Sequence, residues 1–186
     1  MSKDYWEGSL IFEKLDFYFP VFKVKVSEHN ALKDLTLRLL ETADAEAVHS
    51  NTDNISKTDY HIKQGERKPY CDFLLPKLNP YFKLFYDDMR LSQYGYYHTF
   101  HTIWFQQYHN NDTHDWHNHG DCCWSSVYYL ELPKDGPTTE FMDPSGNIMT
   151  ADANEGDLLI FDNMTLHRSP PNLSKDRKTI VSMNIH

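Results

Sequence analysis

The second half of the chain alternates short apolar runs with turn-forming residues. Segments rich in Pro, Gly, Asn and Asp separate these runs, and short strands with frequent turns favour an antiparallel sandwich or barrel. Aromatic residues make up 15% of the chain, which suits a β-rich core. We expect strands over residues 100–108, 124–132, 138–142, 157–161 and 179–185. The sequence therefore predicts a mainly β fold of the α+β class.

The first half mixes strand and helix patterns. Residues 9–26 alternate apolar and polar side chains, as strands do. Apolar residues at helical spacing predict one helix over residues 31–41, capped by Asn30, and a second over residues 80–91. The polar residues 49–60 are expected to form a loop. Helices confined to this half would pack on one outer face of the sheet.

The length and the charge limit what the protein binds. A chain of 186 residues predicts one domain. Its net charge of −9 disfavours bulk nucleic acid, because the phosphate backbone is also negative. No apolar run reaches the roughly 20 residues of a membrane-spanning helix, and the first residues lack the pattern of a secretory signal. We expect a cytoplasmic protein, of a cell or of an infected host, that binds no membrane and whose oligomeric state stays open.

Histidine is concentrated in one stretch, since six of the 11 histidines lie between residues 98 and 119. His117 and His119 are two residues apart, so on a strand both imidazoles would face the same way and reach one metal ion. His167 follows an apolar strand-like run and is the best candidate for a third ligand. Arg177 opens the last predicted strand, where its guanidinium would suit a bidentate pair with a carboxylate.

The chain presents these residues in a fixed order: Tyr108, His117, the strand Val127–Leu130, the strand that begins at Gly156 and Asp157, His167 and Arg177. In order and spacing they resemble the 2-oxoglutarate- and Fe(II)-dependent oxygenases, above all the prolyl-4-hydroxylase-like branch with its small phage and bacterial members. The resemblance covers about residues 98–185. It implies a double-stranded β-helix, or jelly roll, that binds Fe(II), 2-oxoglutarate and O2.

The resemblance also implies a division of the chain and a role for single residues. A single oxygenase domain would span residues 1–186, with N-terminal strands and supporting helices in 1–95 and the jelly-roll core in 96–186. The implied roles are metal ligation by His117 and His167, pairing of Arg177 and Tyr129 with the distal carboxylate of 2-oxoglutarate, and lining of the cosubstrate pocket by Tyr108.

Two further residues are candidates near the end of the chain. Thr179 lies two residues past Arg177 on the same strand face, so its hydroxyl is a candidate contact to the cosubstrate. Arg168 competes with Arg177 for the carboxylate.

At one position the chain departs from the family pattern, which has a carboxylate two residues after the first histidine. This chain has His119 there. Three readings stay open: ligation by His117, His119 and His167; a shifted register in which His119 and Asp121 supply the histidine and the carboxylate; or ligation by Asp121 or Asp115 with His119 behind the ligands. An imidazole in place of a carboxylate would leave the site one charge more positive.

The resemblance implies a dioxygenase that hydroxylates its substrate and releases succinate and CO2. The substrate is a small molecule or a peptide that the sequence does not identify, with a peptidyl proline as the candidate. Two other function classes stay open, namely a cupin-like three-histidine metalloenzyme that does not use 2-oxoglutarate and a non-catalytic jelly-roll binding module. The polar residues 49–70 are a candidate lid or substrate-recognition loop.

Overall fold

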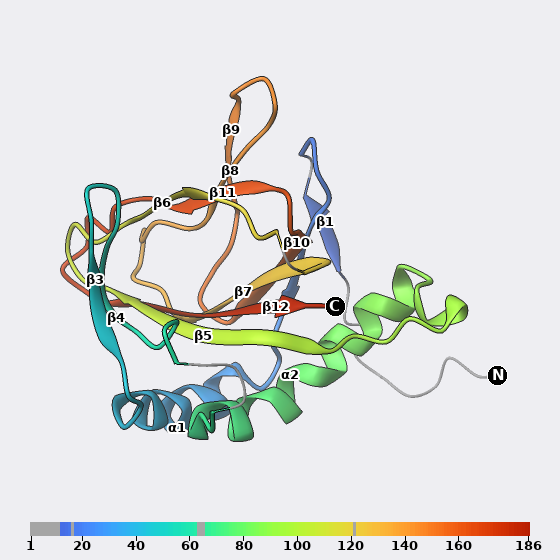
Figure 1. Cartoon of the computed structure of the whole chain (residues 1–186), viewed down its shortest axis with the longest axis horizontal. Helices are drawn as coiled ribbons and strands as arrows, with labels where there is room; N and C mark the ends of the chain where they lie inside the picture. Colours follow the sequence, from blue (N-terminus) through green and yellow to red (C-terminus); the bar gives the residue numbers. More distant parts are fainter. Residues whose placement is uncertain (1–11, 16, 63–65, 121) are drawn as a thin grey trace.

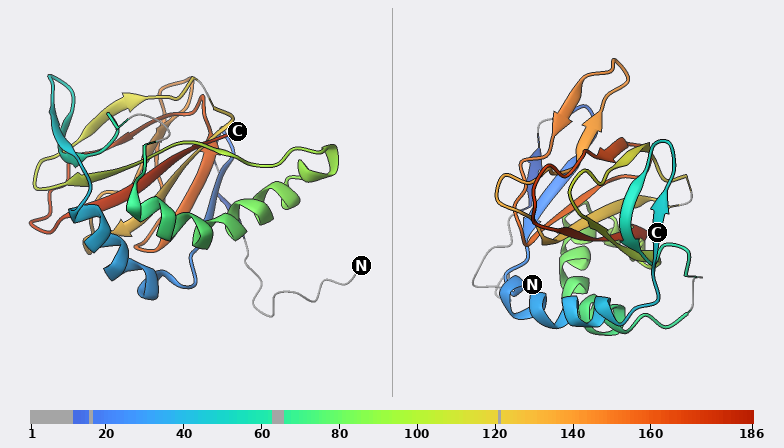
Figure 2. Two further views of the ribbon diagram at one scale, coloured as in Figure 1. Left: turned by 60° about the horizontal axis from the view of Figure 1, so that its bottom comes forward. Right: turned by 90° about the vertical axis from the view of Figure 1, so that its left-hand side faces the viewer.

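Two antiparallel sheets face each other, and two helices cover the outer face of the larger sheet (Figure 1, Figure 2). The computed structural model describes residues 12–15, 17–62, 66–120 and 122–186. The larger sheet has the order β1-β2-β10-β7-β12-β5-β4-β3 and the smaller one the order β6-β11-β8-β9. The predicted mainly β fold, with its helices on one face, is therefore confirmed.

The elements of the larger sheet are β1 (Glu13–Leu15), β2 (Val21–Lys25), β3 (Glu46–His49), β4 (Asn54–Thr58), β5 (Phe100–Tyr108), β7 (Trp124–Glu131), β10 (Asp157–Asp162) and β12 (Lys178–Ile185). Those of the smaller sheet are β6 (His114–His117), β8 (Glu140–Met142), β9 (Ile148–Thr150) and β11 (Leu166–Ser169). The helices are α1 (His29–Glu41), α2 (Pro69–Asp88) and the short 3-10 helix η1 (Ser92–Tyr94).

The two sides of strand β12 show how the two faces of the larger sheet differ. Every residue of this strand is buried, and successive side chains point to opposite sides. Val181, Met183 and Ile185 join the core between the sheet and the helices. Ile180 and Ser182 face the space between the two sheets instead. The strand therefore carries an apolar outer face and a more polar inner face.

Helix α1 corresponds to the predicted helix over residues 31–41, but its predicted cap is wrong. The helix begins at His29, and the residue at its cap is Glu28, which makes no capping bond through its side chain. Asn30 therefore lies inside the first turn. The buried His29 ring shares a 2.7 Å hydrogen bond with the Tyr128 hydroxyl, so a tertiary contact with the sheet holds the start of this helix.

Helix α2 begins at Pro69, well before the predicted start at Pro80. Interior prolines remove backbone hydrogen bonds and normally interrupt a helix. Both Pro76 and Pro80 lie inside α2. A long buried stripe offsets their cost by packing on the sheet, and it consists of Tyr70, Leu74, Leu78, Tyr81, Phe82, Phe85 and Tyr86.

The predicted loop over residues 49–60 is only partly correct, because His49 ends β3 and Asn54–Thr58 form β4, with residues 50–53 in the turn between them. Strand β4 pairs with β5, with Lys57 opposite Gln107 and Thr58 opposite Gln106. Polar residues can form such a strand because the backbone ladder supplies its hydrogen bonds and one of its faces stays open to solvent. The short strands β6, β9 and β11 are likewise absent from the prediction. Strands β1 and β2 lie within the predicted range 9–26, part of which is outside the described residues.

Over the described part of the chain, no helix has the length and apolar character needed to cross a membrane.

Candidate metal and cosubstrate site

Three histidines from the inner side of the smaller sheet converge. His117 ends β6, His119 follows it in the connection to β7, and His167 lies opposite His117 on β11. One nitrogen of each ring lies within 4.8 Å of the others. The cross-strand pairing of β6 and β11 brings together residues that are far apart in the sequence. The geometry thus assembles the three histidines that the first of the three sequence readings names.

The Nδ1 atom of each imidazole makes a hydrogen bond that fixes the ring. The Nδ1 atom of His117 lies 2.7 Å from the carbonyl oxygen of Asp115, and that of His167 lies 2.9 Å from the carbonyl oxygen of Thr165. The Nδ1 atom of His119 lies 2.6 Å from the side-chain oxygen of Asn184. Because a carbonyl or amide oxygen can only accept, each Nδ1 carries the proton and each Nε2 keeps a lone pair. This is the arrangement by which proteins orient histidine ligands of a metal.

Burial favours the neutral form of His117 and His167. Burial lowers the pKa of His167 well below its usual range, and the neighbouring His117 and His119 lower it further. Burial also lowers the pKa of His117, although the carbonyl of Asp115 acts in the opposite direction. Neutral imidazole is the form that binds a transition metal. The chemistry of the donor set therefore fits a divalent metal bound through three nitrogens.

His114 is a fourth histidine beside the three. Its ring stacks on that of His117 at 4.0 Å between centroids, and the amide of Gln106 donates to its Nδ1 over 3.2 Å. Burial lowers the pKa of His114 to about 4. Among the described residues, His114 does not belong to the converging group. It packs against the proposed ligand His117 instead of acting as a ligand itself.

Asp121 and Asp115 are the two acidic residues that the sequence offers as alternative metal ligands. Asp121 lies outside the described residues. Asp115 offers its backbone carbonyl to His117, and its own N–H donates over 3.0 Å to Asp53. Within the described part of the chain, no carboxylate joins the three histidines.

A buried lysine lies on the same inner face of the larger sheet. Lys178 is 1% exposed, and its ammonium donates to the Ser169 hydroxyl over 2.8 Å. Within the described residues no carboxylate forms an ion pair with it, and burial lowers the pKa of its ammonium to about 7. A buried ammonium without an acid partner is costly. An anionic ligand is the partner that would make this arrangement favourable.

The rings of two tyrosines lie beside this lysine. The Lys178 nitrogen lies 5.2 Å from the ring centroid of Tyr108 and 5.9 Å from that of Tyr129. Burial raises the pKa of Tyr108, and it raises that of Tyr129 to about 12. The Tyr129 hydroxyl lies 2.7 Å from the hydroxyl of Thr139 and accepts the Thr139 N–H over 2.8 Å. Both tyrosines therefore lie beside a cation that the sequence analysis did not identify as a candidate.

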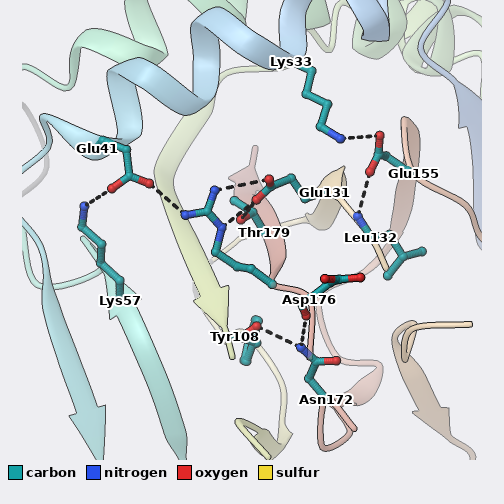
Figure 3. A network of polar contacts seen from close by, with 11 residues as sticks. Lys33, Glu41, Lys57, Tyr108, Glu131, Leu132, Glu155, Asn172, Asp176 and Thr179 are labelled. Atoms are coloured by element: carbon teal, nitrogen blue, oxygen red, sulfur yellow. Dashed lines mark hydrogen bonds and ion pairs between the residues drawn. The ribbon is translucent and has the colours of Figure 1, made fainter. Parts of the chain in front are cut away.

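Arg177 and Thr179 do not reach this face, which corrects their expected role. The Arg177 guanidinium donates to Glu131 over 2.8 and 3.2 Å and to Glu41 over 2.9 Å. The Thr179 hydroxyl also donates to Glu131. In Figure 3, Glu41 and Glu131 approach one guanidinium from two sides, beneath α1. Both predicted cosubstrate contacts are thus bound to acids on the outer face.

The register of β12 explains the correction. Lys178 pairs with Tyr108 across β5, and Ile180 and Ser182 follow it on the inner face. Because side chains alternate, Arg177 on one side of Lys178 and Thr179 on the other must point outward. The polar series Lys178, Ser182 and Asn184, which is interleaved with apolar residues, is the sequence signal that could have identified the inner face.

Arg168, the rival of Arg177, lines the inner cavity. Its Nε donates to Glu140 over 2.7 Å, and its guanidinium lies 4.6 Å from the Trp116 ring centroid. Its charge is therefore already paired. Lys178, whose charge is not paired within the described residues, is the better carboxylate partner.

Two cavities meet at the histidines. The inner one lies between the sheets and is lined by the three histidines together with Tyr108, Thr139, Ser169 and Ile180. It measures about 20 Å³, close to the volume that one water needs, so its side chains must move apart to admit a five-carbon dicarboxylate. The outer one, of about 360 Å³, opens between β6 and the β3–β4 hairpin.

Comparison with known proteins identifies this arrangement. Residues 102–184 match the family model described as "Putative 2OG-Fe(II) oxygenase". This segment belongs to the 2OG-Fe(II) oxygenase family. It contains the three histidines and Lys178, so the match and the geometry agree on a 2-oxoglutarate- and Fe(II)-dependent oxygenase. The predicted family and the predicted cofactors, Fe(II) and 2-oxoglutarate, are confirmed.

Solved structures share the double-stranded β-helix fold of this oxygenase at low sequence identity. A prolyl-4-hydroxylase of Pseudomonas putida is 16% identical, with a TM-score of 0.62 over 91% of this chain and 94% of its own. The viral collagen prolyl hydroxylase of Paramecium bursaria Chlorella virus-1 is 17% identical, with a TM-score of 0.53 over 96% of each chain.

A third neighbour carries out a different reaction. The non-haem α-ketoglutarate-dependent epimerase SnoN of nogalamycin biosynthesis is 12% identical, with a TM-score of 0.64 over 89% of this chain and 77% of its own. No curated protein sequence matches this oxygenase. The structural neighbours therefore establish the fold and leave the substrate open.

Proposed function

We propose that this oxygenase hydroxylates a C–H bond of a peptide substrate, with a prolyl residue as the first candidate, and releases succinate and CO2. One observation carries the proposal. Three imidazoles whose ligand atoms lie within 4.8 Å of one another and one buried ammonium without an acid partner among the described residues lie between the two sheets. This combination suits a metal ion together with an anionic cosubstrate.

The site residues would have separate roles in binding the metal and the cosubstrate. His117, His119 and His167 would hold the metal, and the carbonyls behind them fix their orientation. Lys178 would pair with the distal carboxylate of 2-oxoglutarate through a charge-assisted hydrogen bond, and the buried Tyr108 and neighbouring side chains would keep that end of the cavity dry.

When bound, Fe(II) supplies the redox chemistry that couples oxidative decarboxylation of 2-oxoglutarate by O2 to oxidation of the substrate. The outer cleft leaves room for that substrate next to His117 and His119. Prolyl hydroxylases among the structural neighbours support a peptidyl substrate. The cytoplasm, of a cell or of an infected host, is our proposed location.

A three-histidine metalloenzyme that does not use 2-oxoglutarate is the second candidate. His119 at the position of the family carboxylate favours it. The unpaired charge of Lys178 favours 2-oxoglutarate, because an enzyme without an anionic cosubstrate would gain nothing from a buried ammonium.

Anaerobic spectroscopy separates these candidates. Metal-free protein receives Fe(II) and then 2-oxoglutarate, and the visible charge-transfer band of the chelate is recorded. We expect a band in the wild type and none in His117→Ala. Iron binding without a band would favour the second candidate, and failure to bind iron would contradict both. Succinate formation in the presence of proline-containing peptides then tests the substrate.

A further inference from the structure

The outer cleft is lined by apolar, aromatic and polar side chains. It opens between the β3–β4 hairpin and β6, and its floor includes His117 and His119. Apolar walls come from Val48 and Ile55, both on the hairpin. Residues from the segment predicted as a recognition loop also line it, namely Asp53, Ile55, Thr58 and Tyr60. The hairpin therefore shapes the space that a substrate would enter beside the metal ligands.

Among the described residues that line this cleft, Asp53 is the only acidic one, and none is a lysine or an arginine. The carboxylate is partly exposed, at 25% of its side chain. Its oxygens accept the N–H of Asp115 over 3.0 Å and the hydroxyl of Ser50 over 3.0 Å. These bonds hold a negative charge at the edge of the cleft.

An aromatic pair forms another part of the wall. Tyr60 meets Trp104 edge to face, with 5.2 Å between ring centroids. Trp104 is buried and stacks on His119 at 5.6 Å, whereas Tyr60 is 62% exposed at the rim. Aromatic rings attract cations and apolar C–H groups. This pair leads from the rim of the cleft to a metal ligand.

We propose that this cleft selects a peptide that carries a cationic side chain, lysine or arginine, next to the residue that is oxidised. The inference rests on the proposed function of the cleft as the substrate site. Asp53 would pair with the cation, and Tyr60 and Trp104 would contact its aliphatic stem. An acidic peptide would meet a like charge, and no lysine or arginine among the described lining residues offsets it. The net charge of −9 favours approach of the same basic substrates.

Binding of matched peptides tests this selection without requiring turnover. Three acetylated and amidated pentapeptides have a central proline flanked on both sides by lysine, glutamine or glutamate. Calorimetry at low salt measures their affinity for the full chain loaded with Zn(II). We expect the lysine peptide to bind about fivefold more tightly than the glutamine peptide, as a partly exposed charge contact implies. The glutamate peptide should bind most weakly.

A pair of charge variants locates the effect. Asp53→Asn keeps an oxygen for the Asp115 N–H, and it should abolish the preference for lysine. Asp34→Asn removes the same charge from the exposed side of α1 and should keep the preference. Equal loss in both variants would assign the effect to net charge and overturn the proposal.

Two results with the wild type alone would also overturn it, even if Asp53→Asn does not fold. One is glutamate-peptide binding as tight as lysine-peptide binding. The other is no lysine-peptide binding at millimolar concentration. Loss of the 2-oxoglutarate charge-transfer band would instead contradict the proposed function, so the two failures remain distinguishable.

Discussion

Arg177 and Lys178 are neighbours in the chain and lie on opposite faces of one sheet. Arg177 points outward and pairs with Glu131 and Glu41. Lys178 points inward, is 1% exposed and has a hydroxyl group as its hydrogen-bond partner. The outer cation is satisfied by the protein itself. The inner one is held at a cost that a bound anion would remove, so the contrast separates a structural cation from a functional one.

The same contrast extends over both faces of the large sheet. Its outer face packs an apolar core against α1 and α2. Its inner face combines apolar side chains with polar groups that border the histidines, including Ser182 and Asn184. Changes on the outer face should therefore alter stability, whereas changes on the inner face should alter binding of the metal and the cosubstrate.

The largest effect is expected from the metal ligands. His167→Ala removes one of three nitrogens and should weaken Fe(II) binding more than about 100-fold. This loss exceeds the one expected when a residue that is hydrogen-bonded to a metal ligand is removed. Anaerobic titration with metal analysis measures it. His109→Ala, an exposed histidine outside the group, should bind iron as the wild type does. Unchanged affinity in His167→Ala would refute the three-histidine site.

Separate substitutions of Lys178 and Arg177 test most directly whether one cation binds the cosubstrate and the other stabilises the fold. Lys178→Met should weaken 2-oxoglutarate binding about 100-fold, since a buried charge-assisted hydrogen bond to a carboxylate is lost. Arg177→Met is the matched control: it should keep 2-oxoglutarate affinity and lower the free energy of unfolding by about 1 kcal/mol. Calorimetry and denaturant unfolding measure the two effects. The reverse pattern would restore Arg177 as the carboxylate partner.

The pH dependence of cosubstrate binding follows from the same lysine. Burial lowers the pKa of Lys178 to about 7, and the neighbouring Tyr108 and Tyr129 stay neutral because burial raises their pKa values. Only the ammonium form pairs with a carboxylate, so the 2-oxoglutarate dissociation constant should rise about tenfold per pH unit above pH 7. Lys178→Arg should remove this slope. An identical slope in both proteins would assign it to another group.

Stability should change in the opposite direction over this pH range. Between pH 7 and the usual lysine pKa of 10.5, the unfolded chain binds a proton at Lys178 that the folded chain does not. The free energy of unfolding of the cosubstrate-free protein should therefore rise with pH in this window. Lys178→Met should lack this rise, as denaturant unfolding at pH 7 and pH 9 would measure.

A smaller effect is expected from the partner of His119. Asn184→Leu removes the acceptor of the Nδ1 proton of His119 and should weaken Fe(II) binding about tenfold, because outer partners fix the tautomer and the orientation of a ligand. Asn184→Asp keeps an acceptor and should restore affinity. Equal affinity of the leucine variant and the wild type would mean that the contact with Asn184 does not orient His119.

Several features follow from the sequence because they depend on local pattern. The five strands predicted in the second half all occur, since alternating apolar residues and Pro- or Gly-containing turns determine strands over short distances. The hairpin of β3 and β4 and the first half of α2 were not predictable in this way. Tertiary contacts stabilise both, through the pairing of β4 with β5 and the burial of the α2 stripe.

The sequence by itself indicated the family, the fold class and the candidate histidines, because their order and spacing along the chain carry this information. Only the tertiary structure decided which of Arg177 and Lys178 lies on the inner face of the larger sheet. A strand pattern of period two is compatible with either assignment, and the pairing of Lys178 with Tyr108 selects one of them. The recognition cleft also required the fold, because it joins Asp53 and Tyr60 to His117 across two sheets that the sequence does not bring together.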